Sequence, residues 1–346
     1  MAESPRSDAA LPPPPLGIHP WVAQWRERIG FGLSIFPHPP DWQGFIRLVQ
    51  RMEAMGIDSY WSYDHPAANA DCWTALAALA VTTERIRLGT MVDCIYYRAP
   101  YLLARQAADV DRASGGRLVL GLGIGRLEEE FAVMGLRYPP TPERQRALEE
   151  TVAILRGLWS GEAFTYQGES FTAATPGPWG HFLPPVQEPY VPFLLAGGGE
   201  KTTLRQVARF ADAANMGAHP AIGQAVSDLD IARKFAVLKA WCDDYGRPYE
   251  GVLRTHFTMP LILARTRAAL ATKLADMPQD TLAWAADALF AGTPEEAAAF
   301  YRELAALGFQ YFIANTLSGD EETVELLGTE VVPAFTEAKL AGLAAG

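Results

Sequence analysis

The sequence has few cysteines and no long apolar run, and each shortage excludes a class of protein. Its 346 residues include only Cys72, Cys94 and Cys242, too few and too scattered for a disulfide framework or a metal knuckle. No apolar run reaches the roughly 18 residues that a membrane-spanning helix needs. The opening MAESPRSDAALPPPP lacks the apolar core of a secretion signal. We therefore expect a soluble, cytoplasmic protein.

Positive charge is also in short supply. The chain has 29 lysines and arginines against 40 aspartates and glutamates, a net charge of −11. An acidic surface is repelled by phosphates, so we expect no nucleic-acid partner and no membrane partner. No histidine, cysteine or carboxylate pair has the spacing of a zinc site, and there is no G-x-S-x-G elbow. We expect no metal ion.

What is present is an alternation of short apolar segments with amphipathic ones. Eight segments read as strands covered on both faces: Ile29–Ile35, Asp58–Tyr63, Arg85–Val92, Arg117–Gly123, Tyr190–Leu195, Ala213–Met216, Leu253–Leu263 and Gln310–Ala314. The segments between them have helical spacing: Gln43–Met55, Cys72–Thr83, Tyr101–Ala113, Pro142–Trp159, Thr202–Phe210, Leu229–Tyr245 and Pro294–Ala306. This order predicts the α/β class and a (β/α)8 TIM barrel, with an open doubly wound sheet as the alternative.

The chain divides into an extension and one domain. Residues 1–28 form a Pro-rich N-terminal extension, whose end Trp21 and Trp25 attach to the body, and residues 29–346 form a single barrel domain. Insertions are expected after strands 4 and 7. Gly161–Pro189 has the pattern of a small hairpin, and Arg265–Ala291 that of extra helix. Insertions after barrel strands usually wall the active site.

A run of three glycines follows the fifth expected strand. In Ala196-Gly197-Gly198-Gly199-Glu200, the missing side chains let backbone N–H groups converge just before a helix begins. Such a corner suits a phosphate, and the adjoining Lys201 and Arg205 favour this interpretation. The alternative is a tight turn without a ligand. The spacing is not that of a P-loop.

Asp64 and His65 follow the second expected strand, where a barrel keeps its active site. A histidine can move a proton near neutral pH, and the neighbouring carboxylate of Asp64 can orient it. The alternative is a helix-capping aspartate beside a packing histidine. The acids Glu128–Glu130 read as the start of a helix, stabilised by its dipole, rather than as metal ligands. Cys94 reads as a small core residue.

Several motifs in the same order resemble the bacterial-luciferase-like superfamily of flavin- and deazaflavin-dependent oxidoreductases. The resemblance is closest to the branch that uses coenzyme F420 and covers the chain from about Ile29. It is carried by DSYWSYDH, RIRLGTMV, YYRAPYLLARQAADVDRASGGRLVLGLGIG, LEEEFAVMG, ERQRALEETVAILRGLW and PFLLAGGGEKTTLRQVARFADAAN. It implies a barrel with insertions, a homodimer, and a flavin-type ring at the C-terminal mouth.

The resemblance also assigns residues. His65 matches the histidine at the reactive edge of the ring, and Met91-Val92 the place of a non-proline cis peptide beneath the ring. Beside His65, the other catalytic candidates are Asp64 and Arg126, which this chain has of its own. The expected cofactor-binding residues are Thr90, Met91, Val92, Gly123, Ile124, Arg146, Ala196, Gly197, Gly198, Gly199, Glu200 and Asn215. Glycines such as Gly123 are expected to let a flat ring approach the backbone. The expected substrate-lining residues are Asn69, Cys94, Tyr96 and Tyr97.

Departures from relatives limit what carries over. Some F420-dependent sugar-phosphate dehydrogenases have a glutamate where this chain has Arg126, and a tryptophan where it has Asn69. Gly123 replaces the reactive cysteine of luciferase, which argues against light emission.

The expected activity is hydride transfer with reduced coenzyme F420 on a small organic substrate. The alternatives are an FMN-dependent monooxygenase acting through a flavin peroxide, and a non-catalytic flavin- or deazaflavin-binding protein. A barrel hydrolase or aldolase is disfavoured by the missing metal ligands and barrel lysine.

Overall fold

Eight parallel strands close into a barrel. The computed structural model describes residues 17–35, 41–177, 182–217, 227–285, 288–317 and 319–336. The barrel strands are β1 (Gly30–Ser34), β2 (Ser59–Ser62), β3 (Arg87–Thr90), β5 (Leu118–Gly123), β8 (Phe193–Ala196), β9 (Ala213–Met216), β10 (Leu253–Thr258) and β13 (Tyr311–Asn315). Pairing of β3 with β5 closes the ring, and the two-residue β4 (Asp93–Cys94) adds to β5. The predicted (β/α)8 barrel is confirmed.

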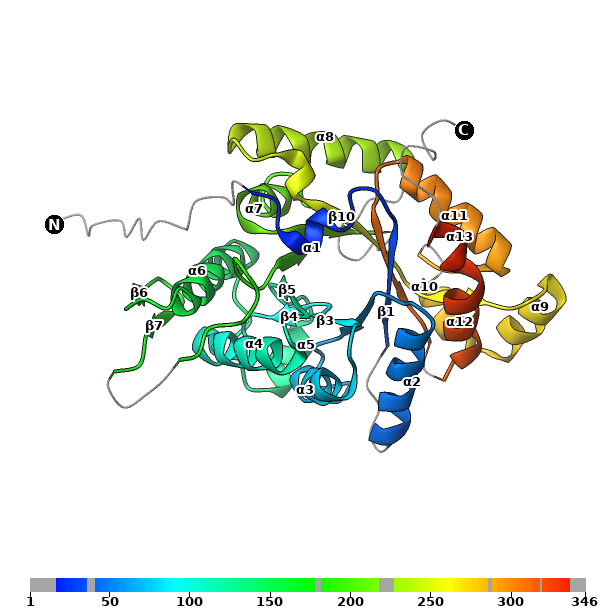
Figure 1. Cartoon of the computed structure of the whole chain (residues 1–346), viewed down its shortest axis with the longest axis horizontal. Coiled ribbons are helices and arrows are strands. Elements are labelled where there is room, and N and C mark those ends of the chain that lie inside the picture. Colours follow the sequence, from blue (N-terminus) through cyan, green and yellow to red (C-terminus); the bar gives the residue numbers. More distant parts are fainter. Residues whose placement is uncertain are drawn as a thin grey trace.

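Helices surround the barrel (Figure 1). The principal ones are α2 (Trp42–Ala54), α3 (Cys72–Thr82), α4 (Pro100–Ser114), α6 (Thr141–Trp159), α7 (Thr203–Phe210), α8 (Asp228–Asp244) and α11 (Pro294–Ala306). Shorter ones are α5 (Glu128–Val133), α12 (Glu321–Leu326) and α13 (Pro333–Thr336). Side chains of Asp41, Asp71 and Ser227 accept N-terminal amides of α2, α3 and α8, and Thr293 begins α11 with a capping box. No helix among the described residues is long and apolar enough to span a membrane.

One large side chain packs inside the barrel. Trp61 of β2 is fully buried, and a β-carbon at Gly32 or Gly89 on the neighbouring strands would overlap its ring. The indole N–H donates to Ser59 Oγ at 2.6 Å, and Ser59 Oγ also lies 2.6 Å from the hydroxyl of Tyr311. Glycines on the flanking strands therefore let one tryptophan pack the centre, as a filled barrel requires.

The segment before β1 covers the N-terminal end of the barrel. Trp21, in α1 (Pro20–Ala23), and Trp25 are 1% and 2% exposed. Both rings meet the ring of Tyr311 edge-on, at 6.5 and 4.8 Å between centroids. The expected attachment by these tryptophans is confirmed. Residues 1–16 lie outside the described residues, and the domain boundary at residue 28 stays a prediction.

Extra elements interrupt the alternation at two places. The hairpin β6 (Thr165–Gln167) and β7 (Thr172–Ala174) lies between α6 and β8. Between β10 and α11 lie β11 (Leu261–Leu263), α9 (Arg267–Asp276), α10 (Gln279–Ala285) and β12 (Phe290–Gly292). The single strand expected over Leu253–Leu263 is wrong, because the barrel strand ends at Thr258 and β11 pairs with β12 instead. Pro260, which follows a cis peptide, has no N–H for the barrel ladder.

Candidate active site

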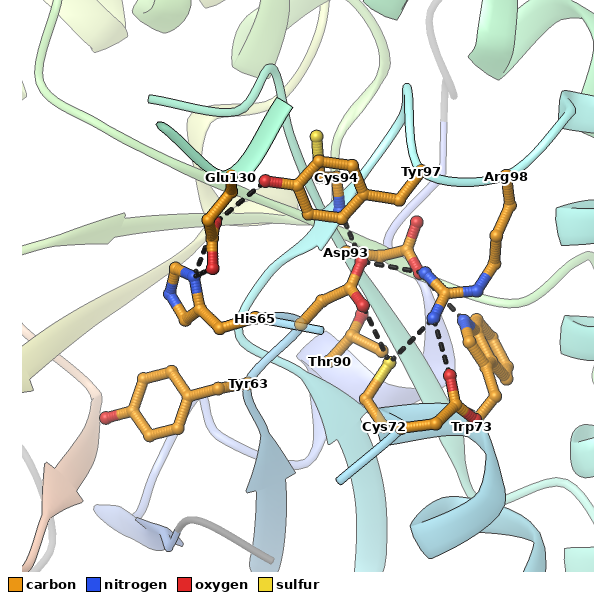
Figure 2. A network of polar contacts seen from close by, with 12 residues as sticks. Tyr63, His65, Cys72, Trp73, Thr90, Asp93, Cys94, Tyr97, Arg98 and Glu130 are labelled. Atoms are coloured by element: carbon orange, nitrogen blue, oxygen red, sulfur yellow. Dashed lines mark hydrogen bonds and ion pairs between the residues drawn. The ribbon is translucent and has the colours of Figure 1, made fainter. Parts of the chain in front are cut away.

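The histidine after β2 is held by an acid from a different strand-end segment. Nδ1 of His65 lies 3.0 Å from both carboxylate oxygens of Glu130, which is in α5 (Figure 2). The hydroxyl of Tyr97 donates to the same carboxylate at 2.8 Å. The side chain of Glu130 is 8% exposed and that of His65 30%. Because an ionised carboxylate only accepts, Nδ1 carries the proton, and Nε2 remains for hydrogen bonding at the barrel mouth.

The expected orientation of His65 by Asp64 is wrong. The Asp64 carboxylate instead accepts from the Arg98 guanidinium at 2.8 Å and from the Cys94 amide at 3.0 Å. Its side chain is 1% exposed, so these donors compensate the burial of its charge. Two neighbouring residues of the segment after β2 therefore have different partners, Arg98 for Asp64 and Glu130 for His65.

Arg98 is the centre of a buried charge cluster. It contacts Asp93 at 3.2 Å and Asp71 at 2.8 Å as well as Asp64. Burial acts to lower the pKa of Arg98, but the carboxylates of Asp93 and Asp64 outweigh it and raise that pKa. Burial raises the pKa of Asp93 well above its usual value, and the charge of Asp64 adds to this. Trp73 donates its indole N–H to Asp93 at 2.7 Å.

The same cluster contains the possible metal ligands found among the described residues. Asp64, Cys72 and Asp93 each offer an atom within 4.8 Å of the others. The guanidinium of Arg98, however, lies 2.8 Å from Asp64, 3.2 Å from Asp93 and 3.7 Å from the sulfur of Cys72. The cation that balances these ligands is therefore an arginine of the chain itself.

The segment after β3 has the expected backbone form. The Met91–Val92 bond is a non-proline cis peptide. A β-carbon at Gly121 would overlap the carbonyl oxygen of Thr90, and one at Gly123 would lie 2.5 Å from Val92 Cγ2. The space beside Gly123 that was expected to admit a flat ring is therefore taken by Val92. Thr90 also donates from Oγ1 to the Gly121 carbonyl at 2.7 Å.

Aromatic rings extend from Tyr97 to the inserted hairpin. Between ring centroids, Phe131 lies 5.4 Å from Tyr97 and 5.8 Å from Tyr96. The Tyr96 centroid lies 5.8 Å from that of Phe171 in the hairpin. Glu150 of α6 fixes the hairpin, since its carboxylate accepts the amides of Glu169, Ser170 and Phe171. Burial raises the pKa of Tyr97, and Cys94 and Glu130 add to this. The hairpin thus packs against Tyr96, one of the tyrosines expected to line the substrate.

The three-glycine corner lies at the same end of the barrel as His65, because both follow parallel strands. Gly197 has φ +124°, which side chains other than glycine rarely adopt, and its amide donates to the Asn215 carbonyl at 3.0 Å. Within the described part of the chain, the amides of Gly198, Gly199 and Glu200 donate to no protein acceptor. Such amides are a backbone cradle for an anion.

The remaining predicted residues are dispersed. Arg126 is exposed, and the side chain of Arg146 is 56% exposed and pairs with Glu169 of the hairpin. Asn69 donates to the carbonyls of Tyr63 and Ala70, while its buried Oδ1 has no partner among the described residues. Asn215 donates to Thr255 Oγ1 inside the barrel.

Two of the remaining residues, Cys94 and Ile124, lie at the ends of β4 and β5. Burial raises the pKa of the Cys94 thiol to about 12, as befits a core thiol. The carbonyl of Ile124 accepts from the buried Arg144 guanidinium, which also bonds the carbonyl of Gly125.

Glu130, Arg98 and Lys234 were not identified as site residues from the sequence. Glu130 was read only as a helix-start acid, although it is the one buried member of its acidic run. Arg98 could have been suspected as a site residue because it follows a strand end and lies five positions after Asp93 in the sequence. No local sequence pattern marks Lys234, which lies in the middle of α8. Only its burial in the folded protein distinguishes it.

Comparison with known proteins places this geometry in a family. The sequence model of the protein family described as luciferase-like monooxygenase matches residues 21–325. An F420-dependent glucose-6-phosphate dehydrogenase of Kribbella flavida is 26% identical over 88% of this chain and 97% of its own. Other curated relatives align over less than half of their length, for example 48% and 38%.

Solved structures share the fold. The coenzyme F420-dependent tetrahydromethanopterin reductase of Methanopyrus kandleri has a TM-score of 0.71 at 20% identity, covering 89% of this chain and 100% of its own. The oxygenating constituent of 3,6-diketocamphane monooxygenase of Pseudomonas putida, in complex with FMN, has a TM-score of 0.70 at 16% identity, covering 88% and 98%. At these identities the likeness concerns the fold.

Proposed function

The chain belongs to the luciferase-like monooxygenase family, and from that membership we propose that it is an oxidoreductase that binds a flavin-type cofactor at the C-terminal mouth of its barrel. Coenzyme F420 with hydride transfer is the first choice, because an F420-dependent dehydrogenase aligns along 88% of the chain. FMN with monooxygenation is the alternative, since an FMN-bound monooxygenase has the same fold.

One observation carries the proposal: a proton-handling histidine and a cradle of unpartnered amides lie at the same end of one barrel. The amides of Gly198, Gly199 and Glu200 fit a phosphate, and the nearest atom to a β-carbon at Gly197 would be 3.4 Å away, on Thr203. Both F420 and FMN carry a phosphate and a flat tricyclic ring. The chain's residues therefore fit this group.

Each residue has a defined task in this proposal. Glu130 keeps Nδ1 of His65 protonated, so Nε2 exchanges a proton with the substrate or ring, and Tyr97 holds the Glu130 carboxylate in place. Met91 and Val92 support the ring, and the glycine corner binds the phosphate. When bound, the ring supplies the hydride or oxygen chemistry. Tyr96 and the hairpin exclude water from the substrate side.

Titration of the purified protein with F420 and with FMN, followed by absorbance and fluorescence, tests the proposal. We expect saturable binding of one of them. In the same preparation, His65→Asn should leave that binding largely intact and lower turnover by roughly 10²–10⁴-fold. Binding of neither cofactor would refute the oxidoreductase. Binding with an unchanged rate in the variant would favour a non-catalytic binding protein or a different acid.

A homodimer in the cytoplasm is part of the same proposal. Light scattering after gel filtration tests the dimer, and a monomeric mass would remove that part without affecting the assignment of the site.

A further inference from the structure

A buried lysine lies behind the glycine corner and takes no part in the steps above. Lys234 is in α8, and its side chain is 8% exposed. Its Nζ donates to the Gly198 carbonyl at 2.6 Å. A β-carbon at Gly198 would lie 3.0 Å from this Nζ and 3.2 Å from Cδ and Cε. The absence of a side chain at Gly198 therefore lets the lysine stem pack directly against the backbone.

This contact fixes the direction of a neighbouring amide. The peptide bond between Gly198 and Gly199 is trans, so its C=O and N–H point in opposite directions. With the Gly198 carbonyl held toward Lys234, the Gly199 N–H points away from α8. That N–H has no protein acceptor among the described residues. Lys234 thereby turns one amide of the cradle outward.

A second side chain of α8 acts in the same way two peptides further on. The indole N–H of Trp241 donates to the Glu200 carbonyl at 3.0 Å. By the same trans geometry, the following N–H, that of Lys201, points away from the tryptophan. Lys234 and Trp241, two turns apart on α8, thus hold two carbonyls of a loop that has no regular secondary structure of its own.

Charge adds to this orientation. The Lys234 ammonium is 3.8 Å from the Glu200 carboxylate, and Arg233 also contacts that carboxylate at 3.3 Å. Arg233 also pairs with Asp230 at 2.8 Å, so two cations and two anions meet here, and the buried Lys234 ammonium is screened less by water than the exposed Arg233 guanidinium. These ion pairs hold the Glu200 carboxylate on the α8 side of the corner.

We propose that Lys234 and Trp241 are positioning residues that orient the amides of Gly199 and of the adjoining Lys201 at the glycine corner, and so determine the selectivity of the site for a phosphate-bearing cofactor. This inference rests on the proposed function and deepens it. It concerns the part of the affinity that comes from the phosphate, not the part that comes from the ring.

Two ligand pairs isolate that part. FMN is compared with riboflavin, and F420 with the phosphate-free deazaflavin of the same ring and ribityl chain. For each pair, fluorescence titration gives the ratio of the dissociation constant of the phosphate-free ligand to that of its phosphate-bearing counterpart. This ratio is measured in the wild type and in Lys234→Met. We expect the variant to lose affinity for the phosphate-bearing member by about tenfold or more, with little change for its phosphate-free counterpart. A general loss of structure would weaken both members alike.

The same helix offers a matched control. Lys239 is 58% exposed and pairs with Asp243, so Lys239→Met removes a lysine charge without touching the corner. It should leave the ratio unchanged. Trp241→Phe removes a single N–H donor and should lower the ratio in the same direction as Lys234→Met. If Lys234→Met does not fold, this variant decides.

The outcomes separate two failures. If the wild type prefers the phosphate-bearing ligands and both Lys234→Met and Trp241→Phe keep that preference, the positioning role is refuted while the proposed function stands. If the wild type binds no member of either pair, the proposed function and this inference fall together. Equal weakening of both members of a pair in the variants also refutes the positioning role.

Discussion

Both carboxylate oxygens of Glu130 lie 3.0 Å from Nδ1 of His65, which precedes it by 65 positions. The residue next to the histidine in sequence, Asp64, is engaged instead with Arg98 at 2.8 Å. The two acids therefore have different roles in the segment after β2. One sets the proton on the histidine, and the other anchors the loop that carries it.

Replacing Glu130 with glutamine should slow turnover without releasing the cofactor. The amide keeps the size of the side chain but no longer forces the proton onto Nδ1 of His65. Loss of a histidine's hydrogen-bond partner costs about 10–100-fold where the histidine is a metal ligand, and we expect a similar fall here. Steady-state rates and cofactor titration measure the two effects, and nitrogen NMR reports the tautomer. Glu129→Gln, an exposed neighbour in the same helix, is the control. An unchanged rate with a changed tautomer would show that the dyad is not used.

Removing the arginine of the buried cluster should destabilise the fold strongly. Arg98→Met leaves the carboxylate of Asp64, whose side chain is 1% exposed, without its cation. Loss of one partner of a buried pair costs about 3–5 kcal/mol. Urea denaturation measures the free energy of unfolding. Arg105→Met removes an exposed arginine of α4 that pairs with Asp109, and about 0.3–0.5 kcal/mol is expected there. Equal losses in the two variants would contradict the cluster's role.

Asp93 should make the stability fall as the pH rises. Burial and the charge of Asp64 raise its pKa in the folded protein, so the folded chain retains a proton that the unfolded chain releases above about pH 4. Its contribution to the free energy of unfolding is therefore full below about pH 4 and declines above it. Asp93→Asn does not titrate, so its free energy of unfolding in urea should rise relative to that of the wild type as the pH increases above about pH 4.

Asp71 provides a control of opposite sign. Burial acts to raise its pKa, but hydrogen bonds from Thr74 and Arg98 outweigh this and lower it. Its contribution is present above about pH 4 and is lost as the pH falls, so the wild type should lose its advantage over Asp71→Asn on acidification. Parallel pH profiles for the two variants would contradict the assignment of Asp93.

The hairpin should loosen when its anchoring carboxylate is neutralised. In Glu150→Gln, an amide with one oxygen replaces a carboxylate that accepts from Glu169, Ser170 and Phe171. Hydrogen bonds to a charged group are worth about 1.5–3 kcal/mol each. Hydrogen–deuterium exchange of the three amides should accelerate about tenfold or more, while exchange in the barrel strands stays constant. Glu162→Gln, an exposed substitution just before the hairpin, should leave all of these rates unchanged.

The alternation of apolar runs and amphipathic segments in the sequence was sufficient to predict the barrel. Ala213–Met216 and Pro294–Ala306 were predicted with the bounds that the structure has. Strands that are covered on both faces are apolar throughout, and helix starts are marked by capping side chains, so both signals are local. The extended strand prediction over Leu253–Leu263 failed because apolar composition continues through Pro260, although the ladder does not.

The sequence by itself determined the order of the elements, and with it which residues stand at the ends of parallel strands: His65, the Met91–Val92 segment and the three glycines. Only the tertiary structure decided their partners, giving Glu130 to His65, Arg98 to Asp64 and Lys234 to Gly198. The physical reason is range. Backbone periodicity and capping act over a few residues and leave a pattern in the chain, whereas a buried charge accepts whichever complementary group the packing brings within about 3 Å, however distant in sequence.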